Sequence, residues 1–117
     1  MEASLELELS TVVIAYNEAE CLVSVVSELH SALSRAGLRF ELVLVDDGSR
    51  DATLLRMREL EARFAEVQVV TLSPNRGIGG ALRAGFDAAR ARYVTWVPAD
   101  GQIAPEVVVR LYAERAR

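Results

Sequence analysis

The sequence of 117 residues contains no lysine, and all thirteen of its basic residues are arginine. This absence excludes a P-loop, which needs a lysine on the phosphates, and a Schiff-base enzyme, which needs a lysine amine. Seventeen acidic residues give a formal net charge of −4. With no arginine-rich run or aromatic platform, the chain is not expected to bind nucleic acid. A polyanionic ligand would therefore need backbone amides, a few arginines or a metal ion to offset its charge.

Cysteine and long apolar runs are also scarce. The single cysteine, Cys21, excludes a disulfide framework and a cysteine-based zinc site, and it suits a reducing compartment. Apolar runs reach about five residues, whereas roughly 20 are needed to span a bilayer, so no transmembrane segment is expected. Residues 1–6 are acidic where a signal peptide would be basic. We therefore expect a cytoplasmic protein.

The chain alternates short β-branched runs with longer amphipathic stretches. With 51% hydrophobic residues, its length suits one domain around one core. Residues 11–15, 40–45, 67–72 and 93–97 have the composition of strands, and apolar residues at helical spacing follow each of them. The order βαβαβαβα predicts an α/β fold, in which a parallel, doubly wound sheet carries helices on both faces. Since no repeat or linker divides the chain, residues 1–117 are expected to form a single domain.

Several helix boundaries and faces can be predicted. Asn17, followed by Glu20, is typical of a capping box at the start of the first helix. Pro105 suits the first turn of the last helix. The third helix is expected to lay one stripe on the sheet, formed by Ile78, Ala81, Leu82, Gly85, Phe86 and Ala89.

In sheets of this kind, ligands bind beyond the carboxyl ends of the strands. Asp46 and Asp47 end the second predicted strand, and adjacent residues of a strand point to opposite sides. One carboxylate can accept hydrogen bonds from a base or ribose, while the other caps the next helix or braces the loop. The alternative is an ordinary turn with a helix cap, for which Asp, Gly and Ser are also the expected residues.

Two further loops at this edge have candidate chemistry. Asp100 and Gln102 offer oxygen ligands that suit Mg²⁺ or Mn²⁺, which often complete their shell with substrate phosphates. The alternative there is a turn without a ligand. The glycine-rich residues 75–80 open a helix whose amides could face an anion, but the spacing lacks the third glycine of a dinucleotide fingerprint. Close packing of a small-residue helix on the sheet is the alternative, and we favour it for Gly85.

Taken together, four motifs resemble family 2 glycosyltransferases of the GT-A fold, over nearly the whole chain and in the right order. They are VVIAYNE at 12–18, VDDGS at 45–49 with Asp51-Ala52-Thr53, NRGIGGA at 75–81 and PADGQ at 98–102. The Asp-Gly-Gln ending is most similar to the branch that glycosylates polyprenyl phosphates. The chain would then be the Rossmann-like nucleotide-sugar-binding half of such a fold.

The resemblance implies a role for each matching position. Ala15, Tyr16 and Glu18 would line the pocket of the nucleobase and ribose. Val45 and Asp47 would complete it, with Asp47 accepting a hydrogen bond from the base. Asp100 and Gln102 would hold Mg²⁺ or Mn²⁺ on the diphosphate of a UDP- or GDP-sugar.

Two positions depart from the family pattern. Ile14 stands where the family often has proline, a change that relaxes the loop. Pro98 stands where the metal motif often begins with another aspartate, so the cation has one protein carboxylate fewer.

The resemblance also implies a reaction and its setting. The complete enzyme would transfer the sugar with inversion to an acceptor such as a polyprenyl phosphate, at the cytoplasmic face of a membrane. Its catalytic base is expected in an acceptor-side half beyond Arg117, so residues 1–117 would be a shortened transferase domain. The alternative is a non-catalytic nucleotide-binding or scaffold module. A phospho-receiver domain shares the βα alternation but needs a lysine that this sequence lacks.

Overall fold

The computed structural model describes residues 6–115, which form four strands and four helices in strict alternation. The four strands are parallel and lie in the order β3-β2-β1-β4. The elements are β1 (Leu9–Ala15), α1 (Ala19–Arg35), β2 (Phe40–Asp47), α2 (Thr53–Arg63), β3 (Val67–Leu72), α3 (Gly77–Ala88), β4 (Tyr93–Pro98) and α4 (Pro105–Ala113).

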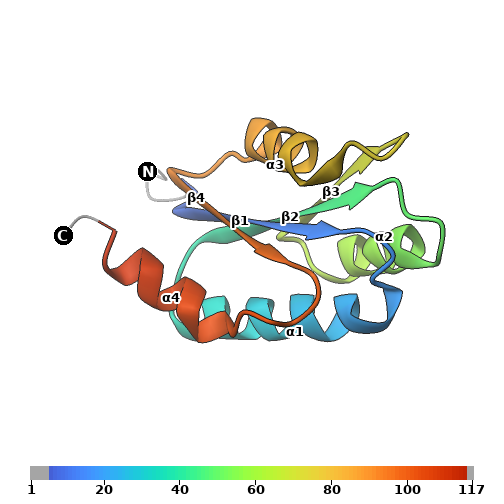
Figure 1. The fold of residues 1–117 in the computed structure, drawn as a ribbon. Coiled ribbons are helices and arrows are strands. Elements are labelled where there is room, and N and C mark those ends of the chain that lie inside the picture. The colour runs from blue at the N-terminus through green and yellow to red at the C-terminus, as the bar shows by residue number, and fades with distance from the viewer. Residues whose placement is uncertain (1–5, 116–117) are drawn as a thin grey trace.

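The helices cover both faces of the sheet, which confirms the predicted doubly wound arrangement. Helices α1, α2 and α4 lie on one face, and α3 covers the other (Figure 1). Because β1 and β2 are buried on both faces, their central residues, 12–15 and 42–45, form continuous apolar runs rather than alternating ones.

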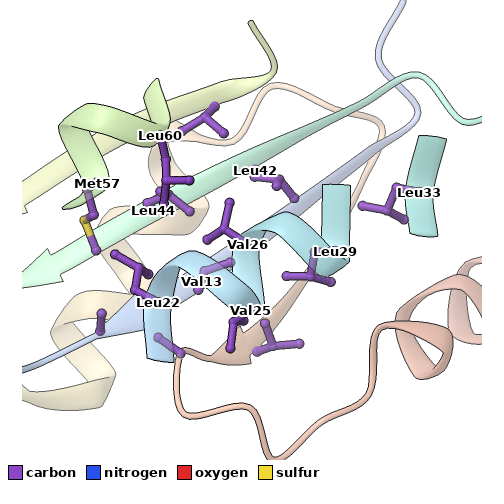
Figure 2. Close-up of a cluster of buried hydrophobic side chains, with 14 of the residues drawn as sticks. Val13, Leu22, Val25, Val26, Leu29, Leu33, Leu42, Leu44, Met57 and Leu60 are labelled. Carbon is purple, nitrogen blue, oxygen red and sulfur yellow. The ribbon is translucent and has the colours of Figure 1, made fainter. Parts of the chain in front are cut away.

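The larger of two apolar clusters lies between α1, α2 and the sheet (Figure 2). Leu22, Val26, Leu29 and Leu33 recur at helical spacing along α1, so they share one face of the helix and bury it completely. Alternate residues of each strand meet this face, while the remaining strand residues point to α3. The smaller cluster beneath α3 contains Val12, Ile14, Val43, Val45, Leu72 and Ala81.

Helix α3 approaches the sheet closely through small residues. A Cβ atom on Gly85 would lie 2.4 Å from Cγ1 of Val12 and 3.1 Å from Cγ2 of Val45, so only glycine fits there. The predicted close packing at Gly85 is therefore confirmed. The prediction of a wider apolar stripe was wrong for Ile78 and Phe86, because these side chains are 60% and 45% exposed. The narrow contact made by Ala81 and Gly85 leaves these larger side chains at the sides of the helix.

The ladder brings three strand ends to the same level at one edge of the sheet. Ile14 of β1 pairs with Val45 of β2 on one side and with Pro98 of β4 on the other. The loops that follow β1, β2 and β4 therefore leave the sheet side by side. This level edge positions the candidate site.

At the opposite edge, a buried carboxylate ties the strands to the end of α3. Glu41 is 1% exposed and accepts hydrogen bonds from Ser10 Oγ (2.6 Å), the Arg90 amide (2.7 Å) and Gln68 Nε2 (2.9 Å). The Arg90 guanidinium adds a contact of 2.9 Å from its Nη2. Burial raises the pKa of Glu41, but these hydrogen bonds outweigh it and hold the pKa below its ordinary value.

Candidate functional site

All seven predicted site residues lie at the carboxyl edge of the sheet or in the loops that leave it. Ala15, Val45 and Asp47 lie at or next to the ends of β1 and β2. Tyr16 and Glu18 follow β1, and Asp100 and Gln102 follow β4. Residues from distant parts of the chain thus converge as the parallel topology predicts.

The two adjacent aspartates bond to different loops. Asp47 is 3% exposed, and its Oδ1 accepts the Arg76 amide at 2.7 Å. Its Oδ2 accepts the Gly77 amide at 2.9 Å and Nδ2 of Asn75 at 3.0 Å. Asp46 is 4% exposed and accepts the Ser49 amide at 3.1 Å within its own loop. Asp47 therefore braces the β3–α3 loop, and Asp46 braces the turn after β2.

This brace changes the expectation for the glycine-rich loop. The amides of Arg76 and Gly77, at the start of α3, already bond to Asp47. The sequence suggested that the amides of this loop could face an anion. The amides of Arg76 and Gly77 are not available for that, because both are bonded to Asp47. A carboxylate offers about four lone-pair positions, so three donors leave Asp47 one further acceptor position, on Oδ1.

Gly48 allows these two loops to meet. Its φ of 75° lies in the left-handed region that favours glycine. A Cβ atom there would also lie 2.8 Å from the backbone nitrogen of Asn75. Any other residue would push the β3–α3 loop away from Asp47.

Asn17 does not cap α1 as the capping-box pattern predicted. Helix α1 begins at Ala19, and Asn17 instead takes a left-handed conformation with φ 54°. Its backbone amide donates to Ser49 Oγ at 2.9 Å. Its Oδ1 accepts the amides of Arg50 at 2.8 Å and Asp51 at 3.4 Å. Because the β2–α2 loop lies alongside, Asn17 serves a tertiary contact rather than its own helix.

Asp51 and Thr53 bond to the start of α1 from the neighbouring loop. Thr53 Oγ1 accepts the Glu18 amide at 2.8 Å, and Asp51 Oδ2 accepts the Ala19 amide at 3.3 Å. Asp51 Oδ1 accepts both the amide and the hydroxyl of Thr53 at the start of α2. The Thr53 hydroxyl, together with the Thr53 and Ala19 amides, holds the pKa of Asp51 below its ordinary value. We call Asn17, Ser49, Asp51 and Thr53 the loop clamp.

The predicted nucleotide-pocket residues differ in accessibility. Tyr16 is 45% exposed and Glu18 is partly exposed. Ala15 and Val45 are 1% and 0% exposed, and Val45 packs beneath α3. Any contact that Ala15 or Val45 makes with a ligand would therefore involve the backbone. The nucleotide-binding roles of all these residues stay predictions.

Asp100 and Gln102 form a small turn after β4. Asp100 is partly buried, and its Oδ1 accepts the Gln102 amide at 3.0 Å, while Gln102 is exposed. Within residues 6–115, no three His, Cys, Asp or Glu side chains gather as a metal cage. Mg²⁺ usually binds one or two carboxylates and completes its shell with waters and substrate phosphates. This donor set therefore fits a cation shared with a diphosphate, not a cation held by protein alone.

Sequence reasoning missed the partners of Asn17, Asn75 and Thr53. A weak signal existed for Thr53, because a threonine two residues after an aspartate is typical of a local Asx turn. The bonds from Thr53 to Glu18 and from Asn75 to Asp47 cross 35 and 28 residues of chain, so no local pattern could indicate them.

The fold and its level edge define an α/β domain of the GT-A type, the class to which its structural neighbours belong. Residues 10–116 match the family described as "Glycosyl transferase family 2". The chain therefore belongs to the family 2 glycosyltransferases.

Curated relatives include enzymes of polyprenyl-phosphate glycosylation. The chain is 37% identical over 112 residues to dodecaprenyl-phosphate galacturonate synthase from Rhizobium johnstonii, which covers 95% of the chain and 33% of the relative. It is 41% identical over 108 residues to dolichyl-phosphate β-glucosyltransferase from Drosophila melanogaster. That match covers 86% of the chain and 33% of the relative. The chain thus spans about a third of the length of these relatives. Among residues 6–115, the longest helices are too short or too polar to cross a membrane.

Solved structures share the fold. Residues 1–349 of S. aureus TarS in complex with UDP-GlcNAc give a TM-score of 0.71 at 26% identity, covering 92% of the chain and 30% of that protein. The mannosyltransferase PcManGT from Pyrobaculum calidifontis, in complex with GDP-Man and Mn²⁺, gives a TM-score of 0.72 at 23% identity. This match covers 81% of the chain and 28% of that protein. At that identity, the second likeness concerns the fold alone.

Proposed function

We propose that the chain is the nucleotide-sugar-binding domain of a glycosyltransferase that passes its sugar, with inversion, to a polyprenyl phosphate. The observation that carries the proposal is the convergence of Asp47 and Asp100 at one level edge, on either side of β1. The family supports transfer of a sugar, and the names of the relatives support a polyprenyl-phosphate acceptor. The TarS complex supports a UDP-sugar as donor, although a GDP-sugar is equally compatible with the edge.

The nucleoside would lie across the ends of β1 and β2. The exposed ring of Tyr16 offers a surface for a base, and Glu18 offers a carboxylate to ribose hydroxyls. Asp47 has one acceptor position left for a base N–H. The backbone of Ala15 and Val45 would form the floor of this pocket.

The diphosphate would extend toward β4. Asp100, with Gln102 beside it, would hold Mg²⁺ or Mn²⁺ on the phosphates, and the bound cation would offset the charge of the departing nucleoside diphosphate. A chain without lysine and with a net charge of −4 needs such a cation more than a basic protein would. A lipid phosphate is already an anionic nucleophile, so this acceptor requires little help from a base.

Isothermal titration of the 117-residue chain with UDP and with GDP, each with and without Mn²⁺, tests the proposal. We expect binding of one nucleotide that Mn²⁺ strengthens, and the Asp100→Asn variant should lose most of this Mn²⁺ effect. Tyr16→Ala should weaken binding about tenfold, because base–aromatic stacking contributes about 1–3 kcal/mol. Glu59→Gln, an exposed substitution on α2, is the control and should bind as the unaltered chain does.

Failure to bind either nucleotide would instead favour the scaffold alternative. The acceptor is tested separately, in a membrane-free assay of sugar transfer to undecaprenyl phosphate. The protein assayed is the full-length transferase that contains this domain. Transfer to a water-soluble sugar but not to the lipid phosphate would contradict the acceptor while leaving the donor site intact.

A further inference from the structure

We propose that the loop clamp is a set of positioning residues, and that Asn17 and Thr53 decide how tightly a nucleotide binds without touching it. The inference rests on the proposed function. The clamp locks the β1–α1 loop onto the β2–α2 loop. It thereby sets the places of Tyr16, which is exposed, and Glu18, which is partly exposed, in the predicted pocket.

Asn17 is the turning point between β1 and α1. Its left-handed backbone, with φ 54°, is a conformation in which asparagine is enriched among non-glycine residues. Three hydrogen bonds hold Asn17 there. Its backbone amide donates to Ser49 Oγ, and its side-chain Oδ1 accepts the backbone amides of Arg50 and Asp51. Both neighbours of Asn17 in the chain, Tyr16 and Glu18, therefore leave it in fixed directions.

The second half of the clamp holds Glu18 itself. The Glu18 amide donates to the Thr53 hydroxyl, which in turn donates to Asp51. Asp51 also accepts the first amides of both α1 and α2, from Ala19 and Thr53. One carboxylate thus lies at the positive ends of two helices and draws them together.

Thr53 is completely buried, and Asn17, although exposed, uses its side-chain oxygen to accept the amides of Arg50 and Asp51 in the β2–α2 loop. Their route to the ligand is therefore indirect. When a binding-competent arrangement is only fractionally populated, the apparent dissociation constant rises by the reciprocal of that fraction. If loss of one clamp bond lets the β1–α1 loop leave its place about nine-tenths of the time, Kd rises about tenfold.

Two substitutions remove clamp bonds with little other change. Asn17→Gly deletes the side-chain amide but tolerates the left-handed backbone. Thr53→Val keeps the shape of the buried side chain and removes its hydroxyl, whereas Thr53→Ser keeps the hydroxyl. Ser10→Ala is the matched control for lost stability, because it removes a bond to buried Glu41 at the opposite edge of the sheet.

The readouts are the Kd of UDP or GDP with Mn²⁺ and the hydrogen exchange of backbone amides, measured where circular dichroism shows every variant folded. We expect Kd about tenfold higher for Asn17→Gly and Thr53→Val, and within about twofold of the unaltered chain for Thr53→Ser and Ser10→Ala. The amides of residues 16–19 should exchange faster in the first two variants, while those of β1 stay protected.

Each outcome decides one of the two proposals. Unchanged Kd in Asn17→Gly and Thr53→Val would overturn the positioning role, and so would an equal loss in Ser10→Ala, which would mark a general effect of stability. An unaltered chain that binds neither nucleotide would overturn the proposed function and this inference with it.

Discussion

Replacing Glu41 should destabilise the domain through its bonds to backbone and buried side chains more than through its ion pair. In Glu41→Gln, one oxygen can still accept from Ser10 and the Arg90 amide, but the new NH₂ group faces the donors on the other side. One N–H of the partly buried Gln68 amide then loses its acceptor, while its other N–H keeps the Ala88 carbonyl. The remaining bonds to Ser10 and the Arg90 amide lose the assistance of a charge.

The magnitude follows from these losses. A hydrogen bond to a charged group contributes about 1.5–3 kcal/mol, and a buried donor without a partner costs about 1–3 kcal/mol. Since part of the network survives, we expect a loss of about 2–3 kcal/mol, which lowers Tm by about 8–15 °C in a domain of this size. The Arg90 guanidinium is 67% exposed, so Arg90→Ala should cost at most about 1 kcal/mol.

Thermal and urea unfolding, followed by far-ultraviolet circular dichroism, measure both variants against the unaltered chain. Glu59→Gln, which breaks an exposed pair with Arg56, controls for loss of a surface charge. If Arg90→Ala destabilised the domain as much as Glu41→Gln, the ion pair would dominate and the reasoning from buried donors would be refuted. A Glu41→Gln shift no larger than that of Glu59→Gln would refute it as well.

Two further outcomes follow from packing and charge. Gly85→Ala should cost about 1–3 kcal/mol by overpacking α3 on the sheet. Gly79→Ala on the same helix should instead stabilise by up to about 1 kcal/mol, because among the described residues no atom outside its chain neighbours and the nearby backbone of α3 lies within 4 Å of the new methyl group. Equal urea midpoints for the two variants would contradict the close approach. The hydrogen bond from His30 holds the pKa of Glu66 below its ordinary value, and the pKa of Glu41 is also lowered. Their stabilisation is therefore complete above the unfolded pKa near 4.5 and is lost as pH falls through the lower folded values. Urea unfolding between pH 3 and 6 should show this decline, and Glu66→Gln should make it shallower; a slope unchanged by that substitution would argue against the His30 bond as its cause.

Elements with strong local periodicity were predictable. The β-branched runs at 11–15 and 67–72 became strands, and the spacing of Leu22, Leu29 and Leu33 placed α1 on the sheet as expected. The parallel, doubly wound order followed from the alternation of strands and helices. The gathering of Asp47 and Asp100 at one edge followed in turn, because every strand of such a sheet ends on the same side.

Helix faces were less predictable where residue size decides the contact. The spacing of Ile78 and Phe86 is that of a buried stripe, yet both are exposed, because Gly85 and Ala81 bring α3 so close to the sheet that a narrow strip suffices. Helical spacing identifies the side of a helix that faces the core. How wide the contact becomes depends on the depth of the approach, which a single sequence does not contain.

The order of elements, the edge where the candidate site residues gather and the family whose motifs occupy that edge were all predictable from the sequence. These properties depend on periods of two to four residues and on short motifs, which are local in the chain. Two contacts depend instead on the folded chain. The Asn17 amide donates to Ser49, 32 residues away, and Asp47 accepts the amides of Arg76 and Gly77 at the start of α3, 29 and 30 residues away. Such partners are chosen by strand order and register, because these set which loops lie within hydrogen-bonding distance of each other.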